Sequence, residues 1–193
     1  PAAAAPAPVA ALTASQLAAK LLRVHLLLWA SFVIALGATA ISGDAESAPE
    51  SILCRGVGRW QYFLGKCAAR ITAVVGLLVV LTLPAILVGA LRMPNDLTMG
   101  GVIRGIWTVA VTLSALTALS VAGSSWFKNP LVGTALVWML LYGAGIVAAV
   151  LEVTPVSPLV LVESLPDLLR GSEPLLHAQL PTFLTSAALA ASL

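Results

Sequence analysis

Apolar residues occur along this chain in long, nearly uninterrupted runs that are separated by short polar stretches. Four runs are long enough to cross a membrane, at about 21–41, 71–91, 105–122 and 131–151, and an incomplete fifth begins near residue 182. A helix of 21 residues rises about 32 Å, close to the thickness of a bilayer's hydrocarbon core. The runs are apolar on all sides, and the alternation typical of a membrane β-strand is absent. The pattern therefore predicts an all-α polytopic membrane protein with four complete transmembrane helices and the start of another.

The composition supports this fold class. Hydrophobic residues make up 60% of the 193 positions and charged residues only 9%. Ten Lys and Arg with eight Asp and Glu are too few to cover the surface of a soluble globule of this size. A soluble enzyme, a nucleic-acid-binding protein and a disordered tail are therefore excluded, and a net charge of +2 marks no polyanion-binding surface.

The two ends of the chain predict that it is an internal portion of a longer polypeptide. The first eight residues form a low-complexity run of Ala and Pro that does not begin with Met. The last apolar run ends at Leu193, after about a dozen of the roughly 20 residues that a span needs.

Chemistry-bearing residues are scarce in the predicted spans. No Asp, Glu, Lys or Arg lies in the middle of a span, although ion relays normally need such a group. His25 lies near the end of a span and His177 in a loop, so they predict no haem or metal site. No paired carboxylates, no HExxH pattern and no GxxxxGK[ST] phosphate loop occur. We therefore predict no catalytic residue, no metal ligand and no cofactor-binding residue on this chain.

Charge alone does not orient the predicted spans. On one side of the membrane, the loop between the first two spans contributes four Lys and Arg residues, and Lys128 is the fifth. The other side also carries five, so the rule that basic residues stay on the cytoplasmic side favours neither orientation.

The segment 44–70, between the first two spans, is the most unusual part of the sequence. Acidic residues come first, and a stretch rich in basic and aromatic residues follows. From Trp60, the apolar residues Phe63, Leu64 and Cys67 fall at the i+3, i+4 and i+7 positions of one helical stripe. Such an amphipathic helix either anchors a protein at the lipid headgroups or forms a docking surface for a soluble partner.

Three parts of the chain resemble the membrane permeases of ATP-binding-cassette (ABC) transporters of the second, exporter-like type, nearest to the copper-processing branch. In the first part, Glu46 and Glu50 stand in the acidic positions of that family, residues 52–59 resemble its turn, and Phe63-Leu64-Gly65-Lys66 resembles its closing motif. The second part is 118–132, which looks like the connection between the family's fourth and fifth spans. The third is Ser157-Pro158 with 165–171, similar to the segment before the last span.

The resemblance implies an organisation for the whole chain. Residues 1–20 are expected to be an external loop, and 21–193 a single transmembrane permease domain with the second to fifth of six spans. The segment 44–70 is expected to be a cytoplasmic coupling segment with an amphipathic helix, and 152–181 is expected to face the outside. The expected location is the plasma (inner) membrane of a bacterium.

The resemblance also implies partners. The chain is expected to be a non-catalytic subunit that pairs as a homodimer or heterodimer of permeases and moves an unidentified substrate with energy from a separate nucleotide-binding ATPase. ATP and Mg²⁺ are expected on that ATPase, and no nucleic acid is involved. The residues expected to bind it are those of the coupling segment: Glu46, Glu50, Arg55, Arg59, Trp60, Phe63, Leu64 and Lys66.

Two alternatives stay open. The chain could be a non-transporting accessory subunit of a larger membrane complex, and the lack of polar groups in mid-membrane fits that role equally well. A membrane-embedded enzyme is the less favoured alternative, because no catalytic constellation lies within reach of a span.

Overall fold

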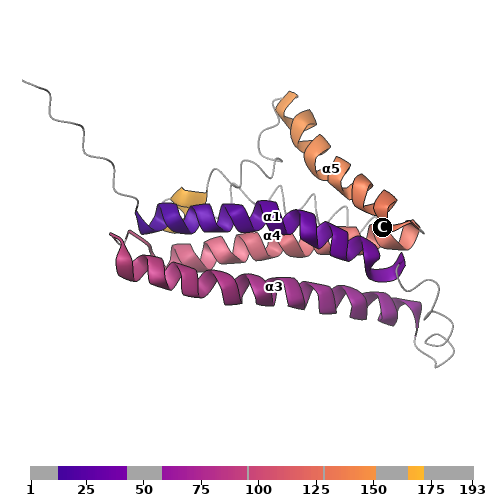
Figure 1. Cartoon of the computed structure of the whole chain (residues 1–193), viewed down its shortest axis with the longest axis horizontal. Coiled ribbons are helices and arrows are strands. Elements are labelled where there is room, and N and C mark those ends of the chain that lie inside the picture. Colours follow the sequence, from indigo (N-terminus) through magenta and orange to yellow (C-terminus); the bar gives the residue numbers. More distant parts are fainter. Residues whose placement is uncertain (1–12, 43–57, 95, 128, 151–164, 172–193) are drawn as a thin grey trace, which may run out of the picture.

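The computed structural model describes residues 13–42, 58–94, 96–127, 129–150 and 165–171. Four long helices fill these ranges: α1 (Ala14–Ser42), α3 (Arg59–Arg92), α4 (Met99–Trp126) and α5 (Pro130–Val150). A short helix covers 165–170. The helices α1, α3 and α4 run alongside one another, whereas α5 crosses them at an angle (Figure 1). Within the described residues all regular secondary structure is helical, as predicted.

Three of these helices are long and apolar enough to cross a membrane: Ala14–Ile41, Trp60–Arg92 and Met99–Trp126. They contain the first three predicted spans. The fourth predicted span is not confirmed: α5 is a helix over Pro130–Val150, but it is not among the helices found long and apolar enough within the described residues. The fifth run, from residue 182, lies outside the described residues.

The helix α1 begins at Ala14, seven residues before the predicted start of the first span at residue 21. Part of the stretch assigned to an external loop therefore forms the first turns of this helix. The helix can begin this early because neighbouring segments supply hydrogen-bond acceptors for its first N–H groups, which have no partner within the helix.

The helix α4 lies at the centre of the bundle. It packs against α1, α3 and α5, and more than half of its most apolar stretch of 18 residues is buried. The core between α1, α3 and α4 consists of aliphatic side chains, among them Leu22, Val33, Leu78, Val109 and Leu113. In a membrane such contacts stabilise the bundle through close packing, because lipid tails are as apolar as these side chains.

The helix α3 presents most of its surface outward: only about a fifth of its most apolar stretch of 18 residues is buried. Its exposed face carries large aliphatic side chains: Leu77, Val80, Leu81, Leu83, Leu87, Val88 and Leu91. Such a face fits the acyl chains of lipid. Pro84 lies inside α3, and the helix continues through it to Arg92.

Small residues bring α1 and α4 close together at the end away from Ala14. A Cβ added to Gly37 would lie 2.5 Å from the Cβ of Ser120. The Ser120 hydroxyl donates a hydrogen bond to the carbonyl of Ile34, and the N–H of Ile41 donates to Ser124 Oγ over 2.9 Å. Close approach through small and hydroxyl residues is a common way to pack helices in a membrane. We call this contact the α1–α4 seam.

Candidate functional site

The predicted docking helix is continuous with the second span. Residues 59–70 form the first turns of α3, which runs without a break to Arg92. The helix begins after Gly58, whose N–H donates to Gln61 Oε1 over 3.1 Å. Its 34 residues rise about 51 Å, well beyond a hydrocarbon core of about 30 Å. If the span is 71–91, the twelve residues 59–70 extend about 18 Å past it. We call these twelve residues the α3 tip.

Large apolar side chains are exposed on the α3 tip. Trp60 is 72% exposed and Leu64 is 57% exposed, one turn apart on the same side of the helix. The half-buried Phe63 ring lies edge-on to Trp60 with 6.0 Å between ring centroids. Lys66 Nζ lies 5.7 Å from the centroid of the Tyr62 ring, a cation–π geometry. An exposed aromatic and aliphatic pair beside basic residues has the composition of a binding surface.

Four of the predicted partner-binding residues are thus within two turns of one helix: Trp60, Phe63, Leu64 and Lys66. Arg59 is the first residue of the helix, and its side chain lies outside the described part. The three remaining residues, Glu46, Glu50 and Arg55, lie in 43–57, outside the described residues.

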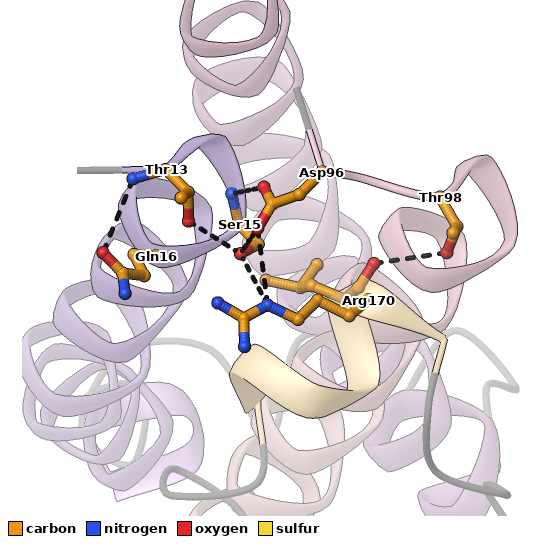
Figure 2. A network of polar contacts seen from close by, with 7 residues as sticks. Thr13, Ser15, Gln16, Asp96, Thr98 and Arg170 are labelled. Carbon is orange, nitrogen blue, oxygen red and sulfur yellow. Dashed lines mark hydrogen bonds and ion pairs between the residues drawn. The ribbon is translucent and has the colours of Figure 1, made fainter. Parts of the chain in front are cut away.

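A polar cluster that the sequence did not single out lies at the other end of the bundle (Figure 2). It joins the start of α1, the turn between α3 and α4, and the short helix 165–170. The Ser15 hydroxyl donates to Asp96 Oδ2 over 2.6 Å, and the Ser15 N–H donates to Asp96 Oδ1 over 2.9 Å. Arg170 Nε donates to Ser15 Oγ over 3.2 Å and lies 3.4 Å from Asp96 Oδ2. We call Ser15, Asp96 and Arg170 the polar clamp.

The clamp explains why α1 begins at Ala14. The N–H of Ala14 donates to the Pro94 carbonyl over 3.2 Å, and the next N–H is taken by Asp96. The N–H of Thr13 donates to Gln16 Oε1 at 3.5 Å, as in one half of a capping box. The Thr-x-x-Gln pattern at 13–16 was the signal in the sequence that could have located this helix start. The contribution of Asp96 had no local signal, because it is 81 residues away from Ser15.

The short helix is seated beside the start of α4. Thr98 caps α4 by accepting from the N–H of Gly101 over 3.1 Å, and its own hydroxyl donates to the Leu169 carbonyl over 3.2 Å. A Cβ on Gly101 would lie 2.2 Å from that carbonyl oxygen, so only glycine fits there. Gly171 ends the short helix at φ +78°, a conformation that favours glycine.

The clamp lowers the pKa of Asp96 to about 2, mainly through the hydrogen bond from the Ser15 hydroxyl, with a further contribution from the Ser15 N–H. A carboxylate at a helix N-terminus is also favoured by the helix dipole. Because the pKa of Asp96 in the folded protein is below its ordinary value of 3.8, the charged form of Asp96 stabilises the fold above that pH. The stabilisation is lost as the pH falls through the window from about 4 to about 2.

We therefore predict a pH-dependent contribution that belongs to Asp96. The Asp96→Asn variant, which keeps the size of the side chain, is expected to be about 1 kcal/mol less stable at neutral pH, because it loses the charge that strengthens the hydrogen bonds from Ser15 and one of the two acceptor oxygens. Between pH 4 and 2 the stability difference between wild type and variant is expected to shrink. Thermal unfolding in detergent, measured for both proteins at several pH values, checks this. A difference that stays constant down to pH 2 would contradict it.

Comparisons with protein-family models, with curated proteins and with solved structures give no match for this chain.

Proposed function

We propose that this chain is the transmembrane subunit of an ABC transporter of the exporter-like type, driven by a separate nucleotide-binding ATPase subunit. The observation that carries the proposal is the α3 tip, an exposed aromatic and aliphatic surface that continues as one helix into a candidate span. The order of motifs that resemble such permeases supports it from the sequence. In this proposal two permease chains, identical or not, assemble in the plasma membrane of a bacterium, and ATP with Mg²⁺ binds to the ATPase.

The geometry of α3 suits mechanical coupling. Trp60 and Leu64 would enter an apolar groove of the ATPase, and Lys66 and its basic neighbours would form charge pairs at the rim. Buried aromatic residues usually dominate such interfaces, and rim charges set specificity and association rate. Because α3 is one continuous helix, a displacement of its tip moves the span as well. That motion reaches α1 and α4, which both pack on α3.

A second candidate is a non-transporting accessory subunit of a larger membrane complex. The outward face of α3 favours it, because this face carries large aliphatic side chains along most of the span and suits contact with an integral neighbour. In that case the α3 tip would anchor the helix at the lipid headgroups or contact an integral protein rather than an ATPase.

Affinity purification in a mild detergent distinguishes the two functions. The full-length protein is purified from its native membrane, its partners are identified by mass spectrometry, and ATPase activity is measured. A P-loop ATPase recovered in a roughly stoichiometric amount supports the transporter. Recovery of integral proteins alone, without ATPase activity, supports the accessory subunit.

A further inference from the structure

The short helix 165–170 is held by the rest of the bundle rather than by its own stability. Six residues are too few to form a stable isolated helix, since even Ala-rich peptides need about 12–15 residues. Its three leucines, Leu165, Leu168 and Leu169, are at most 2% exposed, and Leu165 and Leu169 belong to the same core as α1 and α4. The outer side carries the exposed Asp167 and Arg170. The leucines of the short helix therefore pack against protein.

The contacts of this helix converge on one carboxylate. Asp96 accepts from the start of α1 through Ser15 and pairs with the short helix through Arg170, and it lies in the turn that joins α3 to α4. The carbonyl of Leu169 also contacts this turn, because it accepts hydrogen bonds from the N–H and the hydroxyl of Thr98. Removal of the short helix therefore takes away partners from α1 and from the α3–α4 turn together.

The two ends of the α1–α4 contact differ in what it costs to open them. In the seam, Ser120 is fully buried and Ser124 is 3% exposed, so breaking their hydrogen bonds inside a membrane leaves polar groups without partners. In the clamp, Ser15 is fully buried, but the side chains of Arg170 and Asp96 are 41% and 32% exposed, so water can replace their mutual contact. The clamp is thus the end of this helix pair whose polar contacts are more open to water.

We propose that the short helix 165–170 is a releasable latch: docked, it holds the start of α1 against the start of α4, and its release loosens both at once. The device is a property of the bundle end opposite to the α3 tip, and it stands independently of the partner that binds that tip. Its engagement depends on Gly101, which leaves room for the Leu169 carbonyl, and on the polar clamp.

The test uses thiol labelling in protein whose Cys54 and Cys67 are replaced by Ala. A cysteine introduced by Leu168→Cys is expected to react with a maleimide about tenfold more slowly than one introduced by Met99→Cys, because Leu168 is buried and Met99 is 81% exposed. Equal rates would overturn the proposal, since the short helix would then not be docked.

Variants of the glycine pair at the start of α4 test the release. Gly101→Ala places a Cβ 2.2 Å from the Leu169 carbonyl oxygen and is expected to speed labelling of Leu168→Cys about tenfold. The adjacent Gly100→Ala, whose Cβ meets nothing within 4 Å, is the matched control and is expected to change the rate less than about twofold. Equal effects of the two substitutions would overturn the proposal.

Joint release is tested at α1, in the same cysteine-free background. A cysteine introduced by Ala18→Cys, one turn into α1, is expected to label faster with Gly101→Ala than with Gly100→Ala. The atoms nearest to a Gly101 Cβ belong to Leu169 and Thr98 and not to α1, so this effect on α1 has to pass through the short helix. The milder Ser15→Ala variant, which leaves the glycines intact, is expected to speed labelling of both probes several-fold. Faster labelling of the short helix with no change at Ala18 would overturn the latch.

Discussion

The double variant Trp60→Asp, Leu64→Asp is expected to insert normally and to lose its ATPase partner. Both side chains are exposed, at 72% and 57%, so their replacement removes no core contact. At an interface, truncation of a central aromatic costs about 2 kcal/mol or more, which is about a 30-fold loss of affinity. Two charged replacements in an apolar groove are expected to reduce the ATPase recovered in an affinity purification to background.

The matched control for this variant is Ala69→Asp. Ala69 is exposed on the same helix and lies about 140° around it from Leu64, so the substitution adds the same charge outside the proposed surface. ATPase recovery with Ala69→Asp is expected to stay close to wild type. Undiminished recovery with the double variant would contradict the docking surface, and so would equal losses with both variants. Phe63→Asp is less informative, because Phe63 is half-buried and its loss disturbs packing against Trp60.

Gly37→Val is expected to produce a large loss of stability in the bundle. The Cβ of Gly37 would lie 2.5 Å from the Cβ and 2.6 Å from the Oγ of Ser120, so α1 and α4 must separate. Separation costs about 1–3 kcal/mol for the overpacked contact and about 1 kcal/mol for the hydrogen bond from Ser120 to the Ile34 carbonyl. Thermal unfolding in detergent measures the loss.

Two further variants separate the seam from a general effect of losing glycine. Gly76→Val places its side chain on an open face of α3, where a Cβ meets nothing within 4 Å, and is expected to change stability by less than about 0.5 kcal/mol. Ser120→Gly is expected to recover part of the stability that the smaller substitution Gly37→Ala removes, because it clears the same space. Equal destabilisation by Gly37→Val and Gly76→Val would show that the seam is not where the helices are closest.

The parts of the fold that follow from composition were predictable. Long apolar runs in a chain with few charges give helices, since backbone groups in lipid must find partners within their own segment. Helix ends were predicted less well. The predicted second span begins at residue 71, but α3 begins at Arg59, because the amphipathic pattern of the tip is also helical and no breaker separates it from the span. Apolar periodicity alone does not distinguish a separate surface helix from an extended span.

The polar clamp was not predictable because its members are far apart in the chain. Ser15, Asp96 and Arg170 come from three separate segments, and each looks like an ordinary residue near a helix end. The role of Gly101 was not predictable either, because Gly100 beside it looks the same in the sequence. Only at Gly101 would an added Cβ meet the Leu169 carbonyl oxygen. By contrast, the stripe of Trp60, Phe63 and Leu64 lies within a single helix turn and was visible from spacing alone.

The central claim is that the α3 tip binds a nucleotide-binding ATPase, and photo-crosslinking from Trp60 tests it most directly. A photoreactive phenylalanine derivative replaces Trp60 in the full-length protein, native membranes are irradiated, and the crosslinked partner is identified by mass spectrometry. The same derivative at Ala69 serves as the control on another side of the helix. The account predicts a P-loop ATPase crosslinked from position 60 and far less from position 69. Crosslinks from position 60 to lipid or to integral proteins, with no ATPase among them, would contradict it.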